Sequence, residues 1–186
     1  MSQSRQIKRL ADYQPPAFLT HSIDLEFVLD PVATKVTATS QISRQGASSA
    51  ALTLDGHGFE LIGIWLNGQP WTSYQQDEEQ LILADVPDQF ELKIITQLNP
   101  SANTALEGLY LSGGAYCTQC EAEGFRRISY YLDRPDVLAR FTTHIIADDN
   151  AYPALLSNGN LVSSTLLSDG RRHVTWVDPF PKPSYL

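Results

Sequence analysis

The sequence predicts an all-β protein built mostly from antiparallel strands, arranged as a sandwich or curved sheets with at most short helical turns. Three observations carry this prediction. Apolar and polar residues alternate over short runs, which is typical of strands with one buried face. Turn-forming residues recur at intervals of roughly ten residues, as they do in sandwiches and barrels. Apolar residues at helical spacing are almost absent, so the sequence does not favour long helices.

The first two predicted strands show the alternation most clearly. Ile23, Leu25 and Phe27 alternate with polar residues, and the run ends near Leu29. The segment 36–42 repeats the pattern, and Asp30-Pro31 separates the two runs as a turn. Further strands are expected at 50–54, 58–66, 80–84 and 90–97, with turns at Asp55-Gly56, Asn67-Gly68 and Asp77-Glu78-Glu79. The Asn-Gly pair is the strongest hairpin signal, because tight hairpin turns need residues that tolerate positive φ.

The second half of the chain continues in the same way. A polar connector at 99–104 leads to a predicted strand at 108–113. Asp133 is expected to cap a single helical turn that contains Pro135. The last residues, Tyr185 and Leu186, resemble the start of a further strand, which suggests a piece of a larger protein. The remaining strands are expected at 140–147, 152–157, 160–166 and 171–177, with turns at Asn158-Gly159 and Asp169-Gly170.

Length, composition and charge limit the classes of protein to which the chain can belong. At 186 residues, 42% of them hydrophobic, the chain is expected to form a single globular domain spanning 1–186. The net charge of -8 argues against nucleic-acid and anionic-membrane partners. The basic residues Arg5, Lys8 and Arg9 are not followed by an apolar stretch of signal-peptide length, and no run is long enough to be a membrane helix. We therefore expect a soluble, cytoplasmic protein.

Two cysteines, Cys117 and Cys120, form a lone C-x-x-C motif. Such a motif is redox-active at the start of a helix in a βαβ unit, or is half of a zinc site when a second ligand pair lies nearby. Neither context is visible, and the four histidines are scattered. Reduced, structural thiols are therefore the favoured interpretation, with thiol-redox chemistry or metal binding as the alternative.

The segment 117–127 contains an unusual concentration of thiol, amide, carboxylate and guanidinium side chains. If it is extended, alternation places Gln119, Glu121 and Glu123 on one face and Cys120 on the other. An acidic face with an amide beside it suits a cationic partner, most simply a protonated amine. The alternative is a solvated edge whose glutamates pair with the following arginines.

A set of long motifs makes the chain resemble the N-terminal domain of the bacterial aminopeptidase N family, which are zinc-dependent exopeptidases of the gluzincin class. The resemblance covers essentially the whole chain. It implies a saddle-shaped, mostly antiparallel β domain that precedes a separate catalytic zinc domain, and a role in proteolysis and peptide catabolism. The motifs are TALEGLYLS at 104–112, CTQCEAEGFR at 117–126, YYLDRPDVLARFTT at 130–143, LSNGN at 156–160 and DPFPKP at 178–183.

The resemblance implies two substrate-binding residues in this chain. Glu121 matches the family glutamate that binds the free α-ammonium group of a peptide substrate, and Gln119 matches a neighbour that lines the pocket for the first side chain. Glu123 is instead expected to pair with a nearby arginine.

The catalytic residues of the family have no match here. The chain contains no H-E-x-x-H motif and no G-A-M-E-N loop, so we expect no catalytic or metal-binding residue in it. Zn²⁺ would belong to the full-length enzyme, the catalytic domain of the same chain would be the partner, and the isolated chain should be inactive. The alternative is a stand-alone β-sandwich that serves as a binding or interaction module.

Overall fold

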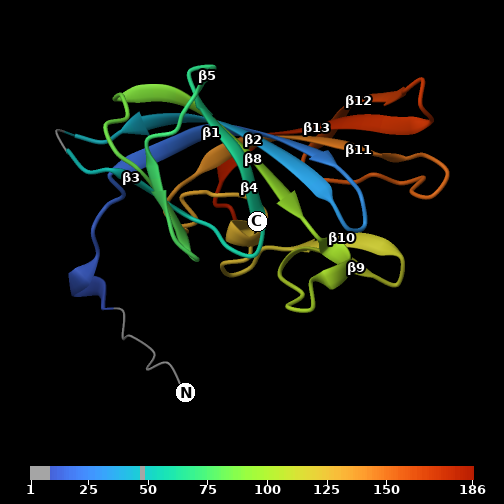
Figure 1. The fold of residues 1–186 in the computed structure, drawn as a ribbon, viewed down its shortest axis with the longest axis horizontal. Helices are drawn as coiled ribbons and strands as arrows, with labels where there is room; N and C mark the ends of the chain where they lie inside the picture. Colours follow the sequence, from blue (N-terminus) through green and yellow to red (C-terminus); the bar gives the residue numbers. More distant parts are fainter. Residues whose placement is uncertain (1–8, 47–48) are drawn as a thin grey trace.

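A computed structural model describes residues 9–46 and 49–186; the basic residues Arg5 and Lys8 lie outside the described part. Its main element is an eight-stranded sheet with the strand order β12-β13-β11-β1-β2-β8-β4-β5 (Figure 1). These strands are β1 (Phe18–Val28), β2 (Thr34–Arg44), β4 (Glu60–Leu66), β5 (Gln69–Pro70), β8 (Gln89–Leu98), β11 (Ala139–Asp148), β12 (Asn160–Leu166) and β13 (Arg171–Lys182).

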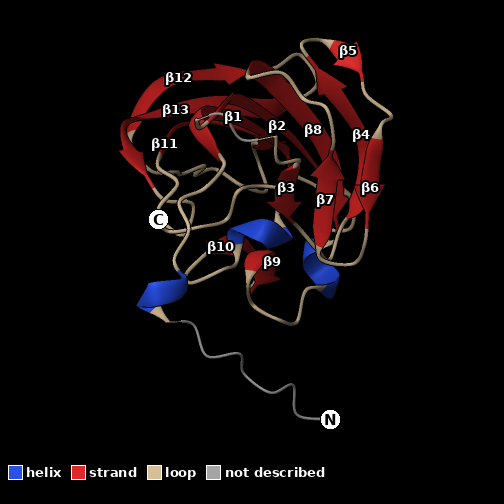
Figure 2. Ribbon diagram, turned by 90° about the vertical axis from the view of Figure 1, so that its left-hand side faces the viewer, coloured by secondary structure: helices blue, strands red, loops and turns tan. Residues whose placement is uncertain are grey.

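Two smaller sheets lie under the concave side of this sheet, which curves over them (Figure 2). One contains β3 (Leu52–Asp55), β7 (Gln80–Leu83) and β6 (Tyr74–Gln76), and the other is the hairpin of β9 (Gly108–Ser112) and β10 (Ala115–Gln119). The pairs are antiparallel except for β1 with β11, which run parallel. The helices of the described residues are short 3₁₀ turns: η1 (Leu10–Asp12), η2 (Pro100–Ala102) and η3 (Phe125–Arg127). The predicted all-β, mostly antiparallel fold is therefore confirmed.

The large sheet has one apolar and one polar face, because its side chains alternate along each strand. In β1 the predicted residues Ile23, Leu25 and Phe27 are buried, whereas Asp24 is exposed. The same alternation buries Val36 and Ala38 in β2. The concave face therefore carries the core, and the convex face presents polar side chains to solvent.

The core lies in two main clusters under the concave face. One packs Leu52, Leu54, Leu81 and Leu83 of the three-stranded sheet against β4 and β8 of the large sheet. The other packs the middle of the large sheet against β9 and η3, through residues that include Leu25, Phe27, Leu109, Phe125 and Tyr131. This second cluster positions the segment that carries the predicted site.

Most of the predicted turns are present. Asn67 (φ 50°) and Gly68 (φ 76°) join β4 to β5 with the positive φ values that the Asn-Gly pair predicts. The Asp30 carboxylate accepts hydrogen bonds from the backbone N–H groups of Val32 and Ala33, both at 2.9 Å, and so closes the turn between β1 and β2.

Two of the predicted strands are wrong, and two short strands were missed. Residues 152–157 form a loop rather than a strand, since Pro153 interrupts the run and Leu155 packs separately under β13. Ser184 and Tyr185 lie in a turn, so no strand begins at Tyr185. The short strands β5 and β6 were not predicted, because two or three residues carry too little pattern.

Among the described residues, no helix is long and apolar enough to span a membrane.

Candidate functional site

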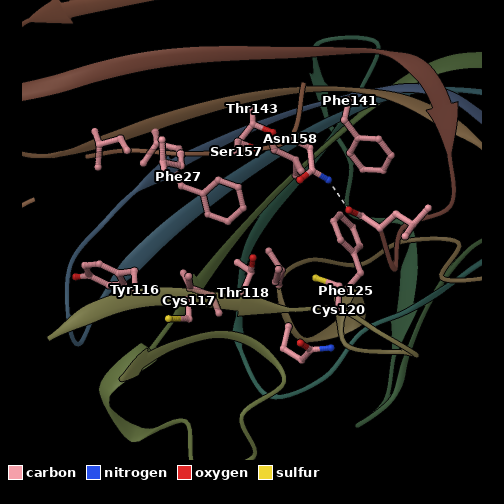
Figure 3. A pocket seen from close by; sticks show the side chains of 18 of the residues that line it. Phe27, Tyr116, Cys117, Thr118, Cys120, Phe125, Phe141, Thr143, Ser157 and Asn158 are labelled. Atoms are coloured by element: carbon pink, nitrogen blue, oxygen red, sulfur yellow. Dashed lines mark hydrogen bonds between the residues drawn. The ribbon is translucent and has the colours of Figure 1, made fainter. Parts of the chain in front are cut away.

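An open cavity of about 690 Å³ lies between the concave face of the large sheet and the β9–β10 hairpin. Figure 3 shows Phe27, Phe141 and Thr143 on the sheet side of this cavity, and Cys117 and Thr118 on the hairpin side. Strands from both ends of the sequence thus build its walls, and the loop at 152–158 closes one side.

The predicted substrate-binding residues lie together at this cavity. Gln119 ends β10, Glu121 follows in a turn, and both line the cavity. The Nε2 atom of Gln119 donates a hydrogen bond of 3.1 Å to the backbone oxygen of Glu121, and the peptide bond after Glu121 is cis. The Glu121 side chain is exposed, so its carboxylate is accessible to a partner.

The extended alternation expected for this segment holds only as far as Gln119. Residues 121–124 form a turn, closed by a hydrogen bond of 2.9 Å from the backbone N–H of Gly124 to the carbonyl oxygen of Cys120. A Cβ atom on Gly124 would lie 2.3 Å from the carbonyl oxygen of Gln119, so only glycine fits this close approach. The prediction that Glu121 and Glu123 continue one strand face is therefore wrong.

Glu123 does pair with an arginine, as predicted. Its Oε1 atom lies 3.6 Å from an Nη atom of Arg126. Within residues 9–46 and 49–186, Glu107 also forms an ion pair, with Arg127 at 3.0 Å, whereas none involves Glu121. The carboxylate of Glu121 therefore differs from its acidic neighbours in having no cationic partner within the described part of the chain.

The turn is anchored in the core directly after Glu123. Phe125 is buried and packs edge-on against Tyr131 and Phe141, with ring centroids 4.9 Å and 6.1 Å away. Arg126 donates to the carboxylate of Asp133 at 2.9 Å and to its backbone oxygen at 3.0 Å. These contacts hold the loop that carries Glu121 against a rigid part of the fold.

Asp133 has a different role from the one predicted. It does not cap a helical turn, because residues 134–137 form only a tight turn without a helix, closed by a hydrogen bond of 3.2 Å from the backbone N–H of Val137 to the carbonyl oxygen of Arg134. Its buried carboxylate instead accepts hydrogen bonds from Arg126 and from the hydroxyl of Ser184. A buried carboxylate needs such partners, and local propensity gave no sign that they come from elsewhere in the chain.

Two further groups near Arg126, the Asp55 carboxyl and the His57 imidazole, have shifted pKa values. Burial raises the pKa of the Asp55 carboxyl, although Arg126 at 3.8 Å opposes this shift. Burial and the positive charges of Arg127 and Arg126 lower the pKa of His57, which favours the neutral form of the imidazole. Both groups pack behind the loop and not in the cavity, so we read them as structural.

The two cysteines are free thiols. Burial raises the pKa of the Cys120 thiol to about 12, which disfavours the thiolate that redox exchange requires. Cys117 lies in strand β10 and Cys120 comes directly after it, so the motif does not stand at the start of a helix in a βαβ unit. The thiol-redox alternative therefore finds no support in the geometry.

Several cavity residues could not be found from the sequence. Thr143, Ser157 and Asn158 line the cavity from β11 and the loop before β12, and the amide of Asn158 donates to the backbone oxygen of Leu186 (Figure 3). They fall within the motifs at 130–143 and 156–160, but no local pattern assigns them to a cavity, because only the tertiary fold brings these segments together.

The described residues are not arranged to hold a catalytic zinc ion. Within 9–46 and 49–186, no group of three or more His, Cys, Asp or Glu side chains lies in an arrangement that could hold a metal ion. The chemistry that this site offers is thus binding of a cation by an exposed carboxylate at the rim of an open cavity.

Comparison with known proteins identifies the family of the chain. The model of the peptidase M1 N-terminal domain matches residues 14–186. The chain is 56% identical over 186 residues to aminopeptidase N of Escherichia coli, and 54% identical over 178 residues to aminopeptidase N of Haemophilus influenzae. It covers 21% and 20% of these two relatives, so it spans about a fifth of their length.

Solved structures show the same fold. Aminopeptidase A of Legionella pneumophila, in complex with aspartic acid, superposes with a TM-score of 0.90 at 34% identity, over 96% of this chain and 22% of that chain. A mutant M1 zinc metallopeptidase of Deinococcus radiodurans, bound to a Tyr-Ser-Ala substrate, superposes with a TM-score of 0.77 at 19% identity, over 91% of this chain and 41% of that chain. The match over nearly the whole chain shows that it belongs to the peptidase M1 N-terminal domain family, with strong homology to bacterial aminopeptidase N.

Proposed function

We propose that this chain is the N-terminal, substrate-anchoring domain of a zinc-dependent aminopeptidase that removes N-terminal residues from peptides. The single observation that carries the proposal is the exposed carboxylate of Glu121 at the rim of a cavity of about 690 Å³. The family match and the much greater length of the relatives support the view that 1–186 is one domain of a larger enzyme. A cytoplasmic location stays a prediction.

Glu121 would bind the α-ammonium group of a peptide substrate. An exopeptidase must distinguish a chain end from an internal amide, and a carboxylate attracts an ammonium group far more than a neutral amide. Two opposite charges about 4 Å apart gain roughly 4 kcal/mol at an effective dielectric constant near 20, before the cost of desolvation. A carboxylate also favours the protonated form of an amine whose ordinary pKa is near 8.

Gln119 would line the pocket for the first substrate side chain. One N–H of its amide already donates to the backbone oxygen of Glu121, which orders the loop. The amide retains a carbonyl oxygen and a second N–H for a ligand. Gln119 therefore combines a positioning role toward Glu121 with a contact surface in the cavity.

Hydrolysis itself is assigned to the part of the enzyme outside this chain. The described residues offer no arrangement for a catalytic zinc ion, so no chemical step is derived from them. We expect the isolated chain to be inactive toward peptides and the catalytic domain to cover the cavity that Glu121 borders.

The test uses the full-length enzyme that contains this chain. Glu121→Gln keeps the size of the side chain and removes its charge, so it should lower kcat/KM for substrates with a free amine by about ten- to hundredfold, the loss of one hydrogen bond to a charged group. The matched control is Glu123→Gln, whose carboxylate already pairs with Arg126. Zinc content should stay unchanged in both variants. Equal kcat/KM values for Glu121→Gln and the unmodified enzyme would rule out the anchoring role.

A further inference from the structure

A cluster of polar side chains that the proposed function does not use lies on the convex face of the large sheet. His144 of β11 and His173 of β13 are neighbours across the antiparallel ladder, because His144 is paired with Thr175 and His173 with Ile146. The Nδ1 atom of His144 lies 3.2 Å from the Nε2 atom of His173, and the ring centroids are 5.4 Å apart. Both residues lie within strands paired to each other, so their positions are set by the sheet.

The hydrogen bonds of His144 determine which of its nitrogens carries a lone pair. Its Nε2 atom lies 3.1 Å from the carboxylate of Asp24, which only accepts, so Nε2 carries the proton. Its Nδ1 atom is then the acceptor, and it lies 3.0 Å from the hydroxyl of Thr175 and 3.2 Å from His173. An imidazole that donates one N–H to a carboxylate and leaves its other nitrogen as an acceptor is the usual arrangement of a metal-binding histidine.

The spacing of the two nitrogens suits one metal ion. Two nitrogen ligands at about 2.0–2.1 Å from an ion lie about 3.0–3.4 Å apart for octahedral to tetrahedral angles. The observed 3.2 Å falls within this range and also within that of an N–H···N hydrogen bond. The hydrogen bond is thus the metal-free state. Binding requires that the remaining proton of His173 move from Nε2 to Nδ1 and that both rings turn until their lone pairs meet at the ion. The ion must also displace the Thr175 hydroxyl from His144 Nδ1.

The surroundings of the pair favour a cation. Glu26 is the register partner of His144 on β1, and Asp24 lies on the same strand face. Arg171, on the same face of β13 as His173, is neutralised by an ion pair of 2.7 Å with Asp169. The His144 side chain is 23% exposed, so an ion and its water ligands have access.

We propose that His144 and His173 form a two-histidine binding site for a divalent transition-metal ion, with Asp24 as the positioning carboxylate. Imidazole ligands select Ni²⁺, Cu²⁺ and Zn²⁺ over Mg²⁺ and Ca²⁺. Within residues 9–46 and 49–186 no third His, Cys, Asp or Glu completes the set, so water molecules fill the remaining positions and the ion exchanges readily. The site is separate from the Glu121 cavity, which lies on the opposite face of the sheet.

The test is calorimetric titration of the 186-residue chain with Ni²⁺ alone, in a buffer that does not bind metals. One site should be found whose affinity falls at least tenfold in His144→Gln and in His173→Gln. Asp24→Asn should lower the affinity by about tenfold, since partners of ligating histidines typically contribute this much. His21→Gln and His57→Gln are the matched controls and should bind like the unmodified chain. Thermal unfolding of each variant checks that the fold is retained.

A second measurement on the unmodified chain does not depend on any variant. Zn²⁺ should shift the ¹⁵N resonances of His144 Nδ1 and His173 Nε2, because these are the nitrogens that would bind the ion. Unchanged Ni²⁺ affinity in both ligand variants, or Zn²⁺ shifts at other histidines only, would overturn the proposal.

Discussion

The guanidinium of Arg126 lies 2.9 Å from the carboxylate of Asp133, and the Asp133 side chain is only 2% exposed. This pair joins the loop that carries Glu121 to the segment that leads into β11. The Asp133 carboxylate also accepts from Ser184, near the end of the chain. The Glu121 loop, the segment before β11 and the end of the chain thus meet at one buried charge, which makes the position of the Glu121 loop dependent on it.

Removing this buried carboxylate should destabilise the chain strongly. Asp133→Ala leaves the charge of Arg126 partly buried without its main partner, and breaking a buried pair typically costs about 3–5 kcal/mol. Asp88→Ala is the matched control, because its ion pair with Arg44 has the same kind of geometry but Asp88 is 88% exposed. Urea unfolding should show a large fall in the midpoint for Asp133→Ala and little change for Asp88→Ala. Equal midpoints would show that Asp133 does not hold the loop.

Gly124 should not tolerate a larger residue. A Cβ atom there would lie 2.3 Å from the carbonyl oxygen of Gln119, and these backbone atoms have little room to move. We expect Gly124→Ala to lower the free energy of unfolding by about 1–3 kcal/mol, as overpacking does. Gly113→Asn is the control, since asparagine tolerates its positive φ of 57° and nothing lies within 4 Å of a Cβ there. Unfolding curves that coincide for the two variants would contradict the steric argument.

The hydrogen bond from Gln119 to Glu121 should affect catalysis in the full-length enzyme. Gln119→Glu keeps the shape of the side chain but removes the N–H that donates to the backbone oxygen of Glu121 at 3.1 Å. The loss of one hydrogen bond of about 1 kcal/mol predicts a fall in kcat/KM of roughly fivefold. Steady-state kinetics with a free-amine substrate measures this, with Gln75→Glu on the exposed strand β6 as the control. An effect of equal size in the control would point to added charge rather than to the lost donor.

The half-buried thiol of Cys120 should make stability depend on alkaline pH. Burial raises its pKa from 9.0 to about 12, so the folded chain holds this proton more tightly than the unfolded chain. The stabilisation is present below pH 9 and is lost as the pH rises toward 12. Between these limits the free energy of unfolding should fall more steeply for the unmodified chain than for Cys120→Ala, by up to about 1.4 kcal/mol per pH unit.

Cys117→Ala provides the control for this pH dependence. Tyrosines titrate in all three proteins over the same range, so the difference between the slopes isolates the thiol of Cys120. Chemical unfolding at several pH values measures the slopes. Parallel slopes for Cys120→Ala and the unmodified chain would mean that the thiol is not buried, and would reopen the thiol-redox interpretation.

The sequence by itself determined most of the strands and most of the turns. Alternation in β1 and β2 and the Asn67-Gly68 turn depend on neighbouring residues alone, because strand faces and positive φ values are local properties. The long motifs around Glu121 likewise identified the family, which the match over 14–186 confirms.

Only the tertiary structure decided how the site is held. The turn after Gln119, the burial of Asp133 and the loop at 152–157 contradict local pattern, because contacts with distant segments outweigh propensity there. The pairing of His144 with His173 follows from the register of β11 on β13, which no local pattern contains. Contacts between residues far apart in the chain are set by how strands pair and sheets pack, and those depend on the whole chain.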